Sequence, residues 1–409
     1  MSKLEHRVAD AMGAPDTEMA HLIGHLAGFD LSGSPHIRDL LGDPAQLNAR
    51  ARQLLSRLFA QLAAQSPIVI QLEDLHYADE ASLNLCNELV AARRDLPLLL
   101  ICLARPTLLE RRPDWGSGQP FHRRIVLAPL DKRDSRDLAR ELLQKVDDVP
   151  KALRDLLVER AEGNPLYMEE LVKMLIEDRV ILKESAGAWR VELGRLAGLR
   201  VPPTLRGLLQ TRFDTLLAPE KLTLQRAAVV GRIFFDSALL ALDAADATHI
   251  GDLQGVLRGL VAREFIHRRE ASSFAGSAEY VFAQAMLRDL IADSLISQQQ
   301  QTYHRAFAGW LAASERADEY LPLIAEHYEQ AGDAAQAATY LEQAGDKAMN
   351  LSAFAEGLAF YTRALALTDQ RLTTNDERAS SFVVRPSSLL AKQAEAQRRL
   401  SDSPATRRP

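Results

Sequence analysis

Hydrophobic and polar positions follow a helix–strand–helix–strand order in the first part of the chain. Residues 44–64 carry leucine and alanine at helical spacing, which predicts an amphipathic helix. The run 67–72 (PIVIQL) is β-branched and too short for a helix, so it predicts a buried parallel strand. Residues 79–94 predict a helix capped by its first residue, 98–103 (LLLICL) a second buried strand, and 124–127 a third. This order indicates an α/β layer with right-handed crossovers.

The pattern becomes helical after the third predicted strand. Helices are expected at 132–145, 150–161 and 166–178. Residues 183–200 are polar and predict a loop or hairpin. Further helices begin at Pro203 and end with 253–263, and two β-like segments, 264–268 and 280–283, flank a Ser/Gly-rich turn. Three helices followed by a hairpin are the order expected of a winged helix.

The C-terminal part is first Ala-rich and then loses its pattern. Between 320 and 368, small residues and aromatics recur at helical offsets, which predicts helix-pair repeats. Stacked pairs would leave a surface for a protein partner. The alternative is that this segment only caps the preceding domain. Residues 369–409 lack periodicity and are rich in Ser and Thr, so they predict a disordered tail.

Composition narrows the class of protein. Hydrophobic residues at 47% and charged residues at 25% are ordinary for a soluble globular chain, which excludes disorder throughout and a disulfide scaffold. Apolar runs fall short of the ~20 residues that span a bilayer, and the N-terminus does not resemble a signal peptide. Cys86 and Cys102 lie in apolar segments and indicate reduced core residues of a cytoplasmic protein. The net charge of −6 argues against large-scale non-specific nucleic-acid binding.

Two adjacent carboxylates stand where the first predicted strand ends. Glu73 and Asp74 follow the run 67–72, and open α/β sheets bind ligands at the carboxyl ends of their strands. Two acids at this position are costly to bury unless they face water, a metal or a polar partner. One could hold Mg²⁺ through water while the other polarises an attacking water. On spacing alone, a pair of helix-capping or loop acids explains them equally well.

Four segments together resemble the STAND class of signal-transduction ATPases, relatives of AAA+ proteins. The similarity is greatest to predicted ATPases fused to adenylate/guanylate cyclase domains or LuxR-type DNA-binding domains. The segments are EDLHYAD at 73–79, similar to the Walker B pattern with Tyr for Trp; LLLICLARP at 98–106, similar to the sensor-1 strand; GNPLY at 163–167, similar to the G-x-P motif; and 282–304, similar to the segment after the winged helix, with Gln284 for the usual His. The resemblance runs from about residue 44 to 368.

This resemblance implies roles for three residues near the first two strands. Glu73 would be the metal-side acid and Asp74 the water-orienting acid, and together they would hold Mg²⁺ through water. Arg105 would sense the γ-phosphate side of ATP. From the residues alone, Arg105 could equally cap a strand end. His76 is expected to pack or to support the site, because no His/Cys/Asp cluster with ligand spacing lies near it in the sequence.

The resemblance also implies that Gly163, Asn164 and Pro165 line the cofactor site, with Pro165 against the base. Without it, the same three residues are explained as a helix stop, because Gly and Asn suit a helix C-terminus and Pro prevents continuation.

A phosphate-binding loop needs the pattern G-x-x-x-x-G-K-[ST]. The sequence contains no Gly-Lys dipeptide, and the family carries this loop upstream of the Walker B strand. We therefore expect that the chain starts after the P-loop and that its α/β layer is partial, with an exposed or helix-covered edge. Binding of ATP or ADP with Mg²⁺ is expected to be weak or absent, and ATP hydrolysis deficient.

Pattern and resemblance together predict the fold class: an α/β partial P-loop NTPase (AAA+/STAND-like) domain followed by mostly α winged-helix and TPR-like helical domains. The predicted domains are 1–130, a partial nucleotide-binding domain with Walker B and sensor 1; 131–200, a helical lid with the GxP motif; 201–315, winged-helix-like; 316–368, TPR-like repeats; and 369–409, a disordered tail.

The resemblance implies a regulatory module in which ATP and ADP favour different states in the intact family. The alternative is a nucleotide-independent scaffold that binds a protein partner through its helical repeats, with self-association as a further option. A DNA-binding transcription regulator fits less well, because the predicted third helix of the winged helix carries only Arg258 and Arg263 as basic residues. No cyclase domain is visible in the sequence.

Overall fold

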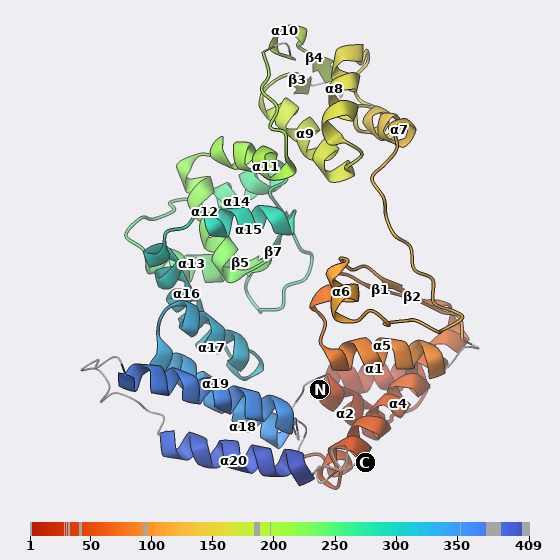
Figure 1. Ribbon diagram of the computed structural model, residues 1–409, viewed down its shortest axis with the longest axis vertical. Helices are drawn as coiled ribbons and strands as arrows, with labels where there is room; N and C mark the ends of the chain where they lie inside the picture. Colours follow the sequence, from red (N-terminus) through yellow and green to blue (C-terminus); the bar gives the residue numbers. More distant parts are fainter. Residues whose placement is uncertain are drawn as a thin grey trace. The chain divides into compact units, whose positions relative to one another are not determined.

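The protein is described here from a computed structural model (Figure 1). The structure describes residues 2–27, 29, 31, 33–40, 43–92, 96–183, 189–196, 198–351, 353–373 and 386–402. The chain divides into two compact units, one formed by 1–124 with 334–409 and the other by 125–333. Within the described ranges, no helix combines the length and the apolarity needed to cross a lipid bilayer.

Helices form the N-terminal part of the first unit. They are α1 (Ser2–Met12), α2 (Thr17–Leu26), α3 (Pro35–Arg38) and α4 (Pro44–Gln65). The long helix α4 begins where the sequence predicts, because the Asp43 carboxylate accepts the backbone N–H of Gln46 at 3.0 Å and Pro44 occupies its first turn. Its apolar face, with Leu47 and Leu54, packs in a core shared with α1, α2 and α3.

A small parallel sheet follows. Its elements are β1 (Ile68–Leu72), the 3₁₀ turn η1 (Leu75–Tyr77), α5 (Glu80–Ala92), β2 (Leu98–Cys102) and α6 (Thr107–Arg111). The two strands pair in register from Ile68 opposite Leu98 to Leu72 opposite Cys102. The predicted strand–helix–strand order is therefore confirmed. The cap of α5 is also as predicted, since Asp79 Oδ1 accepts the backbone N–H of Ser82 at 2.7 Å.

The sheet differs from the sequence prediction in two ways. Its strands are not buried: one face packs partly against the cluster around Leu83, whereas on the other face Val69 is 61% and Leu99 54% exposed. In addition, residues 124–127, predicted as a third strand, form no strand, and their apolar side chains are exposed. An apolar β-branched run favours the strand conformation, but it does not determine what covers the strand.

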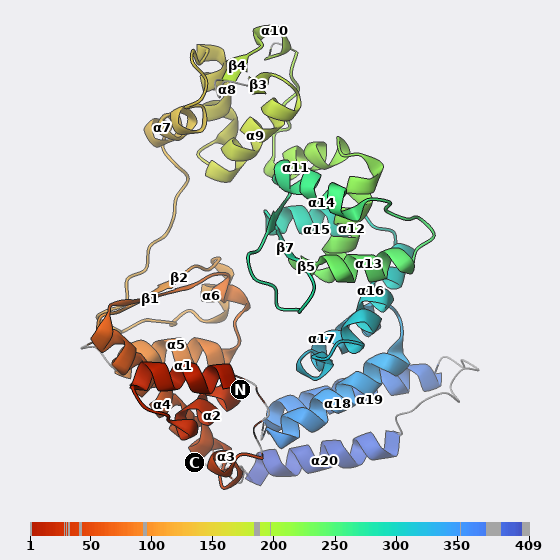
Figure 2. The ribbon, with the colours of Figure 1, turned by 180° about the vertical axis from the view of Figure 1, so that it is seen from behind.

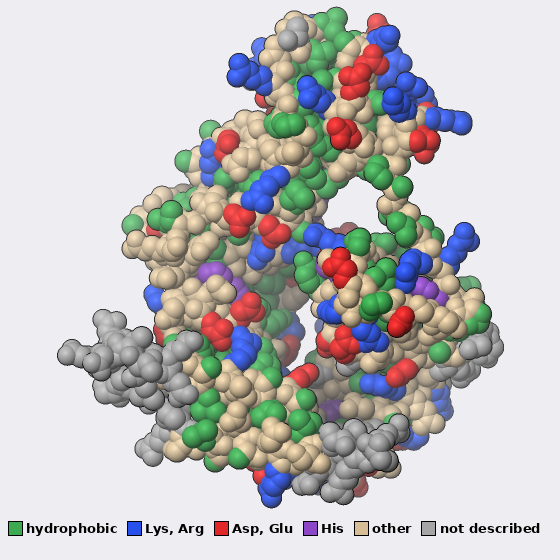
Figure 3. Space-filling model, viewed as in Figure 1, with side chains coloured by type: hydrophobic (Ala, Val, Ile, Leu, Met, Phe, Trp, Pro, Cys, Tyr) green, Lys and Arg blue, Asp and Glu red, His purple; other side chains and the backbone are tan. Residues whose placement is uncertain are grey.

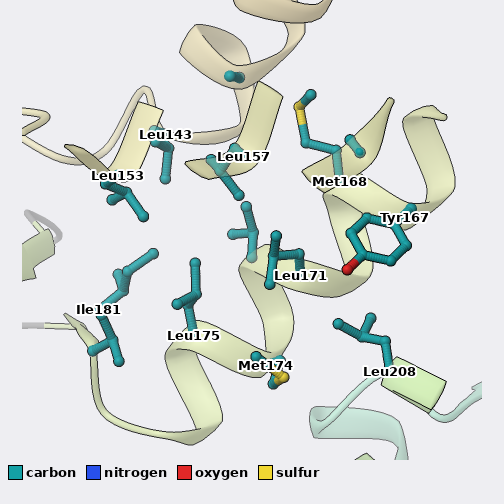
Figure 4. Packing of buried hydrophobic residues seen from close by; sticks show 14 of the residues in the cluster. Leu143, Leu153, Leu157, Tyr167, Met168, Leu171, Met174, Leu175, Ile181 and Leu208 are labelled. Carbon is teal, nitrogen blue, oxygen red and sulfur yellow. The ribbon is translucent and has the colours of Figure 1, made fainter. Parts of the chain in front are cut away.

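The second unit begins with a helical subdomain. It comprises α7 (Lys132–Leu142), α8 (Lys151–Ala161), α9 (Pro165–Glu177), the strands β3 (Ile181–Lys183) and β4 (Trp189–Val191), and the short α10 (Leu193–Leu196). For 183–200, predicted as a loop or hairpin, the structure has the antiparallel β3–β4 pair, which begins two residues earlier, and then α10. Figure 4 shows that leucines of α8 and α9 point into one core, which Leu208 of the following helix also enters. This core therefore continues past residue 200, the predicted end of the lid.

The next elements surround a three-stranded antiparallel sheet. They are α11 (Leu205–Asp214), α12 (Ala218–Val230), β5 (Ile233–Phe235), α13 (Asp236–Ala244), α14 (Leu253–Ala262), β6 (Ile266–Arg268), β7 (Glu279–Phe282) and α15 (Ala285–Asp293). Strand β7 is central, with β5 and β6 at its sides. Helix α14 and the two strands after it lie within a few residues of their predicted positions. The assignment of this part as a winged helix stays a prediction.

Helices complete both units. The second unit ends with α16 (Ser297–Ala312), η2 (Ala317–Glu319) and α17 (Leu321–Gln330), and the first unit is completed by α18 (Ala334–Asn350), α19 (Phe354–Thr373) and α20 (Pro386–Asp402). Figure 2 shows α18, α19 and α20 side by side. The predicted disorder of 369–409 is wrong for α20, whose Leu389 and Ala396 are fully buried. The remainder of that tail, beyond the end of α19, lies outside the described residues.

Candidate functional site

The predicted acid pair lies directly after β1. Glu73 is exposed, and its Oε1 accepts Gln71 Nε2 at 3.0 Å. Asp74 is half-buried and adopts the left-handed conformation, with φ of +53°, which turns the chain from β1 into η1. Asp tolerates this conformation better than most residues. The two acids therefore lie on the turn at the carboxyl end of the strand, where the sequence predicted them.

Arg105 lies after β2 at the same end of the sheet. Its backbone N–H donates to His76 Nδ1 at 3.5 Å. The backbone N–H of Leu75 donates to the carbonyl oxygen of Leu103 at 3.0 Å. These contacts join the turn after β1 to the segment after β2. His76 therefore links these two segments, and with Nδ1 accepting, its proton lies on Nε2. That nitrogen is buried and has no hydrogen-bond partner among the described residues.

Sequence reasoning missed two arginines beside this turn. Arg111 Nη2 of α6 donates to the carbonyl oxygen of Ala78 at 2.5 Å, and Arg112 pairs with Glu80 at the start of α5. Hydrogen bonds from Ser82 and then the charge of Arg111 lower the pKa of Asp79. The Arg-Arg pair that follows the second strand in the sequence is the signal that could have indicated these contacts.

The acid pair suits only part of a magnesium nucleotide. In the part of the chain that the structure describes, no group of three or more His, Cys, Asp or Glu side chains could hold a metal ion. Glu73 and Asp74 could bind Mg²⁺ through water, because this ion keeps several waters and takes its other ligands from phosphate. No lysine occurs in the sequence between Lys3 and Lys132, and no Gly-Lys occurs at all. The sequence around the acid pair thus offers carboxylates for a hydrated metal ion and no lysine for phosphate.

The Gly163–Asn164–Pro165 segment connects α8 to α9 in the other unit. Gly163 is buried with φ of +80°, and a Cβ there would lie 2.3 Å from the carbonyl oxygen of Leu130. Asn164 caps α9, since its Oδ1 accepts the backbone N–H of Tyr167 at 3.2 Å, and Pro165 occupies the first turn. The simple explanation of these residues as a helix stop is thus correct, and they also begin the next helix.

The same three residues line a pocket of about 510 Å³. Its other lining residues include Leu127, Pro129, Arg160, Tyr167, Pro203 and Leu205. The hydroxyl of Tyr167 donates to the carbonyl oxygen of Pro202, which fixes one wall. A pocket of this size is in the range of small-molecule sites, roughly 300–1,000 Å³. The structure thus brings Gly163, Asn164 and Pro165 together in one site, and it places the acid pair with Arg105 in the other unit.

Comparisons with known proteins agree with the fold. Residues 131–188, most of the helical subdomain, match a domain of unknown function (DUF8739). An uncharacterised protein of Rhizobium meliloti (strain 1021) is 25% identical over 342 residues, which cover 79% of this chain and 30% of the relative. The chain therefore spans less than a third of the length of this curated relative.

A solved structure extends the comparison to nearly the whole chain. The crystal structure of a Signal Transduction ATPase with Numerous Domains (STAND) protein with a tetratricopeptide repeat sensor, from Pyrococcus horikoshii, matches with a TM-score of 0.50 and 12% identity. The match covers 94% of this chain and 56% of that protein. The fold of this chain is similar to that of the STAND protein.

Proposed function

We propose that the chain is a signal-transduction module of the STAND type, in which bound nucleotide influences the state of the helical part. The fold similarity to a STAND protein over 94% of the chain carries the proposal. Glu73, Asp74 and Arg105 at the carboxyl end of an open parallel sheet support it, because ligands bind at this edge of α/β sheets. The pocket beside Pro165 supports it as well, because its volume of about 510 Å³ and its mixed polar and apolar lining are suited to a nucleoside.

The proposed cofactor is ATP or ADP with Mg²⁺, bound weakly. Glu73 and Asp74 would hold the metal through water. Phosphate binding normally needs a glycine-rich loop with its lysine, and the chain has neither. We therefore propose that this polypeptide alone hydrolyses ATP little or not at all, and that the retained acids serve binding rather than turnover.

A nucleotide-independent scaffold is the second candidate. The helices α18, α19 and α20 pack side by side, the arrangement of helical repeats that bind partners. Direct DNA recognition has less support, because the loop between β6 and β7 is held by other parts of the unit: Phe274 stacks near Tyr320, and Arg316 donates to the carbonyl oxygen of Ser273. Arg263, directly after α14, forms an ion pair with Glu220. Arg258 is therefore the exposed basic residue of α14 that could still contact DNA.

The test is nucleotide binding and turnover on one preparation. Fluorescent ATP and ADP analogues with Mg²⁺ are titrated against the wild type, Asp74→Asn and a control, Asp155→Asn, on the exposed face of α8. Asn also tolerates the left-handed conformation, so the first variant should fold. We expect weak binding that Asp74→Asn decreases and the control does not, with no turnover.

Two results would change the proposal. Turnover that Asp74→Asn abolishes would show that the chain is an active ATPase. Absence of binding, or binding that is equal in all three proteins, would favour the scaffold.

A further inference from the structure

A buried cluster of charged side chains joins α9 to three later elements of the same unit. At its centre is Glu170 of α9, whose side chain is 0% exposed. Its Oε2 accepts Arg212 Nη1 of α11. Its Oε1 accepts Lys173 Nζ at 2.9 Å and Gln284 Nε2, at the start of α15, at 2.7 Å. Both carboxylate oxygens are therefore used, and two of the three donors come from outside α9.

Arg212 is equally enclosed, with its side chain 1% exposed. Its Nε donates to Glu177 Oε2 at 3.1 Å, and its Nη2 donates to Glu177 Oε1 at 2.9 Å and to the carbonyl oxygen of Arg263 at 2.8 Å. The guanidinium also lies 4.7 Å from the centre of the Phe265 ring. Burial acts to lower the pKa of Arg212, but hydrogen bonds to Glu177 and the charge of Glu170 outweigh it and raise the pKa.

Such a cluster is stable only when it is complete. Removing one partner of a buried ion pair leaves an uncompensated charge in an apolar surrounding, which costs far more than the pair itself contributes. Separating α9 from α11 would take both carboxylate partners, Glu170 and Glu177, from Arg212 and leave Glu170 with Lys173 as its cation. We therefore expect the interface to open cooperatively rather than through a range of partly open arrangements.

Apolar contacts reinforce the same interface. Leu208 of α11 is fully buried in the core formed by α7, α8 and α9, and Leu205 packs against it. Helix α11 thus completes the hydrophobic core of the preceding subdomain while its Arg212 enters the ion cluster.

We propose that Glu170, Arg212 and Gln284 form a latch that fastens the 131–188 subdomain to α11, α14 and α15 without help from nucleotide. None of the three residues lines the pocket beside Pro165, and none belongs to the acid pair. The latch therefore goes beyond the proposed nucleotide function. It makes residues 131–293 a single body, so that any response to nucleotide moves this body as a whole.

Hydrogen–deuterium exchange of the full chain tests the latch. Glu170→Gln keeps the shape of the side chain and removes one of the two carboxylates that pair with Arg212; the other is Glu177. We expect the exchange of backbone amides in α9, α11 and the first turn of α15 to rise at least about tenfold together, because a hydrogen bond to a charged group contributes about 1.5–3 kcal/mol. The control is Asp243→Asn, which weakens the other buried arginine cluster, around Arg226. It should raise exchange in α12 and α13 and leave α9 unchanged.

Several results would overturn the latch. These are faster exchange in α9 alone with α11 unchanged, an equal effect of Asp243→Asn on α9, or wild-type protection of the interface that depends on added Mg-ADP. If Glu170→Gln does not fold, Gln284→Leu replaces it, with a severalfold rise expected at α9 and the start of α15, and no rise there counts against the latch. Because the Asp74→Asn binding test reports on other residues, either proposal can fail while the other stands.

Discussion

The backbone N–H of Leu130 donates to the carbonyl oxygen of Gly163 at 2.8 Å, and this contact leaves no space for a side chain at position 163. A Cβ there would lie 2.3 Å from the Leu130 oxygen and 2.9 Å from its nitrogen. The glycine also has φ of +80°, which is unfavourable for residues with a side chain. The segment that ends at Leu130 is therefore held against the turn between α8 and α9, and Pro129 becomes a wall of the pocket.

Gly163→Ala should destabilise the protein by about 3 kcal/mol or more, because it adds a backbone clash to the cost of the left-handed conformation. Gly332→Ala is the matched control, since Gly332 has φ of +71° in the same unit and nothing lies within 4 Å of the position that an alanine Cβ would occupy there. The control should lose about 1 kcal/mol. Urea denaturation measures the free energy of unfolding of both variants. Equal losses would show that the backbone at Leu130 moves away from an added Cβ at little cost.

The helices around this pocket could be predicted because the sequence carries their start signals. Asp131 and Asn164 cap α7 and α9, and each accepts backbone N–H groups of the following turn. The sheet was less predictable. A run such as 67–72 indicates a strand by its β-branched residues, whereas its burial depends on elements far along the chain. The tail prediction failed at α20 for a similar reason, because few apolar side chains, such as Leu389, suffice to dock a helix.

The acid pair could be placed from sequence, because adjacent carboxylates after an apolar strand have few other positions to occupy. The contact between His76 and Arg105 could not, since it joins residues 29 positions apart through one backbone N–H. The contact between Glu170 and Arg212 could not be predicted either, because the two residues are 42 positions apart. From the sequence alone, charged residues of a helix are expected to face solvent. Which charged residue of a helix is buried is decided by tertiary packing.

Stability should fall in mild acid because of a pair of buried histidines. His304 Nδ1 of α16 and His327 Nδ1 of α17 lie 2.8 Å apart. At this distance the two rings form a hydrogen bond in which one nitrogen is protonated and the other accepts. Burial and the charge of Arg288 lower the pKa of His304 to about 4. Burial, His304 and Arg288 lower the pKa of His327 to about 3. Since both values are below the ordinary 6.5, the unfolded chain binds more protons, and stability is lost as the pH falls below 6.5.

The expected slope is up to about 1.4 kcal/mol per pH unit for each histidine. Urea midpoints at several values between pH 7.5 and 4.5 measure it. Carboxylates with a lowered pKa, such as Asp243 and Glu279, lower the stability mainly below about pH 5, where the unfolded chain begins to bind their protons, so the slope is read above that pH. His304→Asn should reduce the slope of stability against pH to about half or less. An unchanged slope would show that other groups cause the loss of stability in acid.

The loop between β6 and β7 should be a structural part of the unit. The ring of Phe274 lies 4.9 Å from that of Trp310 and 4.7 Å from that of Phe235. Phe274→Ala should cost about 3 kcal/mol and shift the Trp310 fluorescence to longer wavelength as water enters. Both the variant and its reference also carry Trp115→Phe and Trp189→Phe, so that Trp310 is the single tryptophan whose fluorescence is measured. An unchanged spectrum would show that the loop is not held there.

Surface charge should matter far less than buried charge. On the face seen in Figure 3, Lys and Arg side chains are interspersed with Asp and Glu over α7 and α8, which is the pattern of an ordinary solvated surface. Arg140 of α7 is typical: its side chain is 75% exposed, and it pairs with Asp137 at 2.8 Å. Arg140→Ala should therefore change the free energy of unfolding by about 0.5 kcal/mol or less.

Arg226→Ala should have the opposite outcome. The Arg226 side chain is 0% exposed, and it donates to Asp243 Oδ1, to Asp246 Oδ2 at 3.0 Å and to the carbonyl oxygen of Thr248 at 2.6 Å. Its removal leaves two partly buried carboxylates, 18% and 23% exposed, without their cation, so we expect a loss of about 3 kcal/mol. Equilibrium urea unfolding, compared with Arg140→Ala, measures it. A loss similar to that of the surface variant would mean that water replaces the guanidinium and that Asp243 and Asp246 are hydrated in the folded protein.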